Sequence, residues 1–137
     1  MKANIKVLVA GLALLALALP IYAHHPFAVE FDKDKPVTIT GTVTKVDWSN
    51  PHAHIFIDAK GENSGNWDVE LGSPGKLRRI GWKKDFIKMG DQVTITGWRA
   101  RDGSNHANAN MVTLPNGERM AAGSSYFEHR KEKRTGN

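Results

Sequence analysis

Apolar and polar residues alternate along much of the chain from Val37 onward, and this period of two constrains the fold more than any other feature. The segment Val-Thr-Ile-Thr-Gly at residues 37–41 places its apolar side chains on one face, which is typical of a half-buried β-strand. The same five residues recur at 93–97, and each glycine is expected to allow a sharp bend. The alternation predicts five strands, at residues 37–48, 53–57, 67–71, 93–98 and 107–114.

The first of these segments changes phase near its middle. Apolar residues keep one phase as far as Val43, and Val46 and Trp48 then take the opposite one. An extra residue in one strand of a pair shifts the alternation in this way, so the sequence predicts a β-bulge between Val43 and Val46.

Helical spacing replaces the alternation between the third and fourth strands. Leu77, Ile80 and Phe86 fit a helix better than a strand. Ser73 is a suitable N-cap because Pro74 follows it at the first helical position. Gly81 is expected to divide this region into two short helical pieces.

The predicted order of three strands, a short helix and two strands indicates a mainly β fold. It is the layout of the OB-fold, a partly open Greek-key barrel of five strands. We therefore expect an OB-like barrel domain over residues 37–125, preceded by a segment at 24–36. Another small β-barrel or a sandwich is the alternative.

The amino terminus has the features of a secretory signal peptide. Lys2 and Lys6 precede an unbroken apolar run at residues 7–19, and Ala23 offers a small residue for cleavage. The run is shorter than the roughly 20 residues that span a bilayer, although an uncleaved membrane anchor is the alternative. We expect residues 1–23 to be removed and the mature protein to lie in the periplasm, not embedded in the membrane.

Charge and cysteine content exclude several classes of function. Removing the two lysines of the signal lowers the formal net charge from +5 to +3, since 17 basic residues then face 14 acidic ones. The excess is diffuse and partly lies in the basic tail at 126–137, which we expect to be disordered, so nucleic acid is not an expected partner. The chain has no cysteine, which excludes disulfides, thiol catalysis and cysteine-bound zinc.

Two histidines would begin the mature chain. Cleavage after Ala23 makes His24 the new terminus, whose α-amine and imidazole could bind one metal ion together with His25. Copper(II) favours such nitrogen-rich, near-planar sets. Cleavage one residue earlier would make Ala23 the terminus and His25 the third residue, and an amino terminus with histidine at its third position also binds copper(II) or nickel(II). The alternative is that both histidines have no role.

A second group of candidate metal ligands lies on the predicted hairpin of the second and third strands. His52 and His54 share the face opposite Ala53, and a turn around residues 60–65 would set His54 opposite Glu70 and Phe56 opposite Asp68. Imidazoles beside carboxylates can bind zinc, copper or nickel. The alternative is an exposed polar face that carries a histidine–glutamate contact.

The loop before the fifth strand adds a further histidine. In an OB-fold this loop and the one joining the first two strands flank the usual ligand groove, so His52 and His106 are expected at the same end of that groove.

Among the tryptophans, Trp67 and Trp82 are predicted core residues by their phase. The remaining candidates for ligand contacts are Trp48, Asn50, Trp98 and Asn105, alongside Glu70.

No catalytic motif is present. The sequence has no Gly-x-Ser-x-Gly elbow, phosphate-binding glycine loop or His-Glu-x-x-His motif, so we do not expect an enzyme.

The sequence leaves two hypotheses for the function of this protein. One is a periplasmic ligand-binding module that takes copper or another divalent metal; the other is a metal-independent protein that docks on an envelope protein or polymer.

The segments at residues 23–32, 35–38, 41–43, 50–53, 69–74, 90–91 and 102–105 form a recognisable pattern. Together they resemble a family of small secreted bacterial proteins, the domain of unknown function 6152. The resemblance extends from His24 to about Ser125 and implies an exported domain of unassigned activity, with no catalytic residues to transfer. His24, His25 and His52 match the family pattern, whereas position 54 is more often aromatic there, so a site using His54 would not be shared by the family.

Overall fold

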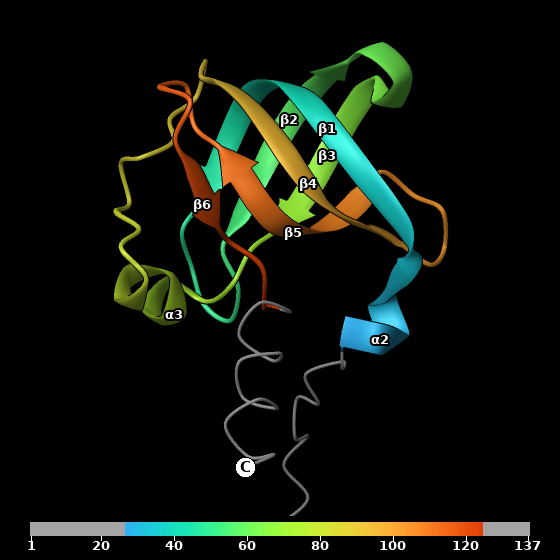
Figure 1. The fold of residues 1–137 in the computed structure, drawn as a ribbon, viewed down its shortest axis with the longest axis horizontal. Helices are drawn as coiled ribbons and strands as arrows, with labels where there is room; N and C mark the ends of the chain where they lie inside the picture. The colour runs from blue at the N-terminus through green and yellow to red at the C-terminus, as the bar shows by residue number, and fades with distance from the viewer. Residues whose placement is uncertain (1–26, 125–137) are drawn as a thin grey trace, which may run out of the picture.

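The computed structural model describes residues 27–124 and confirms a mainly β protein (Figure 1). No helix within these residues is long and apolar enough to cross a membrane. The described elements are α2 (Phe27–Glu30), β1 (Phe31–Asp47), β2 (His54–Lys60), the 3₁₀ turn η1 (Gly61–Asn63), β3 (Gly65–Glu70), α3 (Pro74–Arg79), β4 (Gln92–Ala100), β5 (His106–Thr113) and β6 (Arg119–Ala121).

The strands pair in the order β3-β2-β1-β4-β5-β6. Neighbours in this order are antiparallel, and β3 also pairs with β5 in parallel. Starting from β3, each of the first five strands therefore pairs with the next in the order β3-β2-β1-β4-β5, and β5 pairs again with β3. This second pairing of β3 places its residues beside those of β5, which is four places away in the strand order.

Strand β1 begins at Phe31, earlier than the predicted start at Val37, and takes part in two pairings. Its register against β2 shifts between Val43 and Lys45, which confirms the predicted bulge. The two Val-Thr-Ile-Thr-Gly segments lie against each other, with Ile39 opposite Ile95.

The glycines of these segments allow strands to approach closely. A Cβ on Gly41 would overlap the carbonyl oxygen of Asp58, and one on Gly97 would overlap that of Asn108. The close approach of a neighbouring backbone therefore explains both glycines.

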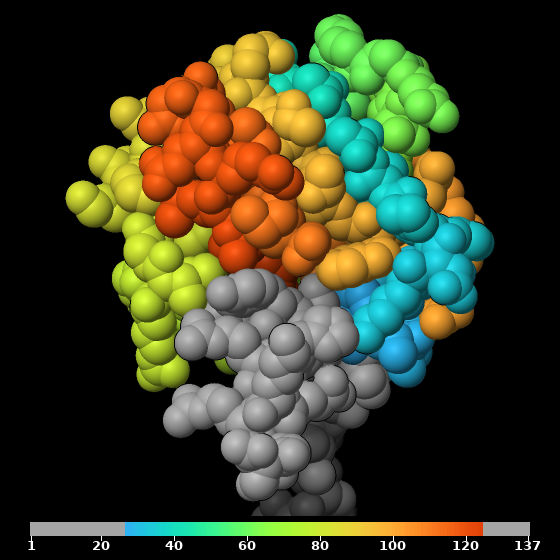
Figure 2. All heavy atoms as spheres, viewed as in Figure 1, coloured from blue at the N-terminus to red at the C-terminus, as the bar shows by residue number. Residues whose placement is uncertain are grey.

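The inward faces of the strands form one apolar core. Trp67 and Trp82 are buried, as their phase predicted, and Val69 and Leu71 join them. In Figure 2 the β5–β6 hairpin lies beside α3 and the segment after it, and the Trp82 Nε1 donates to the carbonyl of Ala121 at 2.8 Å. This hydrogen bond ties the α3 region to β6.

The predicted helix between the third and fourth strands is confirmed as α3. The Ser73 hydroxyl accepts a hydrogen bond from the Lys76 amide at 3.3 Å, and Pro74 begins the helix. The second helical piece, expected after Gly81, was a wrong prediction because residues 82–87 contain only a turn, a bend and irregular backbone. Both Trp82 and Ile87 are buried, and a helix would turn two side chains five residues apart roughly 140° away from each other.

Two elements had no signal in the alternation. Strand β6 pairs with the end of β5, and α2 precedes β1. Phe27 of α2 and Phe31 form a separate small cluster with Ala100, against which Trp98 packs. This cluster fixes the position of α2, which carries Glu30 at its end.

Candidate metal centre

The β2–β3 hairpin has the predicted register. His54 lies opposite Glu70 and Phe56 opposite Asp68. Ala53 and the inward residues of β2 are buried, whereas His52 and His54 are half-buried on the outer face. The alternation therefore placed both imidazoles and both carboxylates on one surface.

The two histidines each contact a carboxylate of β3. His52 Nδ1 lies 2.6 Å from Glu70 Oε1, and His54 Nδ1 lies 2.7 Å from Asp68 Oδ1. His54 thus bonds diagonally across the hairpin to Asp68 and not to Glu70, its directly opposed residue, which side chains of this length can reach. The hydrogen bond that His54 donates to Asp68 raises the pKa of His54 against the opposing effect of burial. Burial acts to raise the pKa of Asp68, but the hydrogen bond and charge of His54 lower it overall.

His106 joins this surface because β5 runs parallel to β3. It pairs with Asp68, and its Nδ1 lies 3.1 Å from the Asp68 carbonyl oxygen. A carbonyl oxygen only accepts hydrogen bonds, so Nδ1 must carry the proton. In a neutral ring Nε2 then has the lone pair, and it lies 3.2 Å from Oε1 of Glu30.

Glu30, Glu70 and His106 each direct one potential ligand atom into the same space. These three atoms all lie within 4.8 Å of one another. An imidazole lone pair and two carboxylates repel each other unless a cation lies between them, whether a second proton on His106 or a metal ion. One nitrogen and two oxygens suit a borderline divalent ion such as zinc.

The position of Glu30 depends on contacts far along the chain. The Arg101 amide donates to the Glu30 carbonyl at 2.9 Å, and the Arg101 Nε donates to the Ala28 carbonyl at 2.8 Å. The Phe31 ring lies 5.1 Å from the imidazole of His106. The loop before β5 and the aromatic cluster therefore bring α2 to the site together.

An open hollow of about 650 Å³ covers this surface. His54 and His106 lie in it with their rings nearly parallel, 6.4 Å apart. Two other predicted site residues, Glu70 and Asn105, also belong to its lining. The lining residues are Glu30, His54, Asn66, Asp68, Glu70, Asp102, Ser104, Asn105 and His106.

The other predicted site residues lie outside this lining. His52 reaches the site through its bond to Glu70. Trp48 packs on Trp82 with ring centres 6.3 Å apart, and Trp98 packs edge-on against Phe27, so both contribute to packing. Asn50 is exposed. His24 and His25 lie outside the described residues.

Sequence reasoning missed two residues of the site. Glu30 carried no local signal because its role depends on a contact with His106, 76 residues away. Asn108 is fully buried, and its Nδ2 donates to Glu70 Oε1 at 3.1 Å. Alternation places the Asn108 side chain on the face of β5 opposite Ala107 and Ala109, so the strand pattern gave no signal that it is buried.

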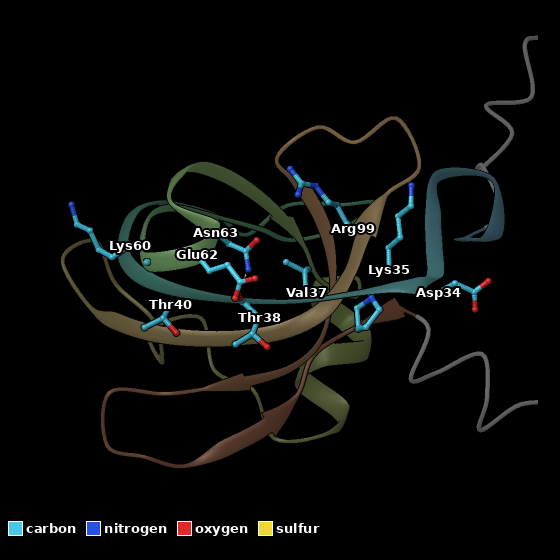
Figure 3. Close-up of a pocket in the computed structure, with 11 residues that line it drawn as sticks. Asp34, Lys35, Val37, Thr38, Thr40, Lys60, Glu62, Asn63 and Arg99 are labelled. Atoms are coloured by element: carbon cyan, nitrogen blue, oxygen red, sulfur yellow. Dashed lines mark hydrogen bonds between the residues drawn. The ribbon is translucent and has the colours of Figure 1, made fainter.

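A second hollow, of about 940 Å³, lies between the start of β1 and the β2–β3 turn (Figure 3). Arg99 borders it and stacks over the Trp67 ring at 5.0 Å. Arg99 also donates a hydrogen bond to the Asn105 side chain at 2.8 Å. This bond stabilises the loop before β5, which borders the hollow that contains His106. The lining of this second hollow contains lysines and acidic residues but no histidine. The imidazole chemistry therefore belongs to the hollow that contains His54 and His106.

Comparisons with known proteins place the chain in a family. The comparison with curated proteins returns no match. The family of unknown function DUF6152 matches residues 12–109, which include the β2–β3 hairpin, Glu30 and His106. The chain therefore belongs to the DUF6152 family.

Proposed function

We propose that this chain is an exported, periplasmic binding module that holds a divalent metal ion among Glu30, Glu70 and His106. The observation that carries the proposal is the orientation of His106. Its Nδ1 is committed to the Asp68 carbonyl, so Nε2, which lies 3.2 Å from Glu30 Oε1, is the nitrogen left for an ion, and Glu70 supplies the third potential ligand atom of the set. This arrangement calls for a cation, and mixed nitrogen and oxygen ligands suit zinc(II) or copper(II).

The fold we propose for the module is an OB-fold-like barrel of five strands, to which β6 is added. The circuit of strand pairings and the place of α3 between β3 and β4 support it. In OB-folds the connections after the first and fourth strands flank the ligand site. His52 and Asn105 belong to those two connections, beside the proposed metal.

The amino-terminal histidines are proposed as further ligands, for copper in particular. Phe27 packs against Phe31, whose ring contacts His106. His24 lies only three positions before Phe27 in the sequence, a stretch of chain that spans at most about 10 Å. Export is supported by the signal-like segment at residues 1–23, since cleavage there would expose His24.

The test is metal binding by the untagged mature protein. The protein is produced by export, stripped with a chelator and titrated with zinc(II) or copper(II) by calorimetry. We expect one ion to bind at the folded site with micromolar or tighter affinity. His106→Ala and Glu30→Gln should abolish that binding, whereas Glu62→Gln, a matched change at an exposed acid of the second hollow, should not alter it.

Two outcomes would contradict the proposal. One is binding of zinc(II) only at millimolar concentration, and the other is an affinity that His106→Ala leaves unchanged. If a periplasmic protein or polymer were instead retained in the presence of chelator, the metal-independent interaction role would replace it.

A further inference from the structure

The Glu70 carboxylate is held from two sides through the same oxygen. His52 Nδ1 lies 2.6 Å from Oε1, and Asn108 Nδ2 lies 3.1 Å from it. The Asn108 Nδ2 also donates to the Ser124 hydroxyl at 2.9 Å, so both amide hydrogens have acceptors and the amide orientation is determined. Asn108 is fully buried, which prevents this amide from turning toward solvent.

Building on the proposed function, we propose that His52 and Asn108 are positioning residues that turn Glu70 toward the metal, and that His52 is not itself a ligand. A carboxylate with two donors on one oxygen still has its other oxygen for an ion. Outer partners of this kind orient metal ligands in many sites.

The geometry of the imidazole supports this assignment. The Nδ1 of His52 must be protonated to donate to an ionised Glu70, so this nitrogen has no lone pair for a metal. Its other nitrogen lies on the far side of the ring from Glu70. Among the described residues, the set of ligand atoms within 4.8 Å of one another contains His106 and excludes His52.

Each of the three proposed metal ligands is thus oriented by a contact with another group of the protein. Asp68 orients His106 through its carbonyl, and the Asp68 carboxylate in turn accepts from His54. His52 and Asn108 orient Glu70, while the backbone of Arg101 holds Glu30. A zinc ion held by these three side chains alone keeps a position for water or an exchangeable ligand, and this is the position that an amino-terminal histidine would take in the copper form.

The test uses the mature protein with ¹⁵N-labelled histidine, loaded with ¹¹³Cd(II) as a spectroscopic substitute for zinc. A one-bond ¹¹³Cd–¹⁵N coupling is expected at Nε2 of His106 and at neither nitrogen of His52. His52→Ala should lower zinc affinity about 10- to 100-fold and keep the stoichiometry at one. His52→Gln, which retains an N–H donor, should restore part of the loss.

The outcomes separate the two proposals. A coupling to His52, or an unchanged affinity in His52→Ala, would overturn the positioning role while leaving the metal site in place. Absence of any cadmium or zinc binding by the unsubstituted protein would overturn the proposed function itself. Because the coupling is measured on that protein, a variant that fails to fold does not prevent the test.

Discussion

Replacing Asn108 with leucine should destabilise the metal-free protein strongly. Leucine has nearly the same size and shape, so the change removes hydrogen bonds of the amide Nδ2 without opening a large cavity. One bond goes to the Glu70 carboxylate and the other to the Ser124 hydroxyl. A bond to a charged acceptor contributes about 1.5–3 kcal/mol and a neutral one about 1 kcal/mol. The expected loss in the free energy of unfolding is therefore about 3 kcal/mol.

Urea denaturation of Asn108→Leu, followed by tryptophan fluorescence, would measure this loss. For a domain of this size, 3 kcal/mol corresponds to a fall in Tm of roughly 10–20 °C. Asn110→Leu is the matched control, because Asn110 lies two residues further along β5 and is only half-buried. A change below about 0.5 kcal/mol in Asn108→Leu would refute the view that Asn108 anchors Glu70.

Two further predictions concern the hairpin and the close approach of strands. NMR titration of the metal-free protein should give His54 a pKa above 6.5, and Asp68→Asn should lower it. The His54–Asp68 pair therefore contributes its full stability through His54 below pH 6.5, and this contribution is lost as pH rises through the raised pKa of His54. If the free energies of unfolding of the unsubstituted protein and Asp68→Asn differed by the same amount at every pH, this prediction would be contradicted. Gly97→Ala should destabilise the fold by several kcal/mol in thermal denaturation, because its Cβ would overlap the Asn108 carbonyl. Gly75→Ala, where a Cβ meets nothing within 4 Å, should be neutral or slightly stabilising, and equal effects of the two substitutions would refute the steric argument.

Features with a local cause were predictable from the sequence. Period-two alternation identified the five main strands and their buried faces, and a change in its phase located the bulge after Val43. The short turn determined the register that sets His54 opposite Glu70. The Ser73–Pro74 pair located the start of α3. In each case neighbours in the chain decide the outcome, so a short window of sequence contains the necessary information.

Prediction failed where apolar spacing was ambiguous or the segment was very short. Residues 82–87 have a helical spacing, but the burial of both Trp82 and Ile87 favours turns. Strand β6 has three residues and α2 has four, which are too few to show a period. Their positions depend on contacts with β5 and with the aromatic cluster, which the local pattern does not encode.

The sequence by itself determined which side chains share a strand face and therefore placed His54 beside the carboxylates of β3. Only the tertiary structure decided that His106 and Glu30 join them. His106 arrives through the parallel pairing of β3 with β5, and Glu30 through the packing of α2 on Phe31 and its backbone bond to Arg101. The physical reason is that a strand's own sequence specifies its buried face, whereas the choice of neighbouring strand depends on how all the strands pack around one core.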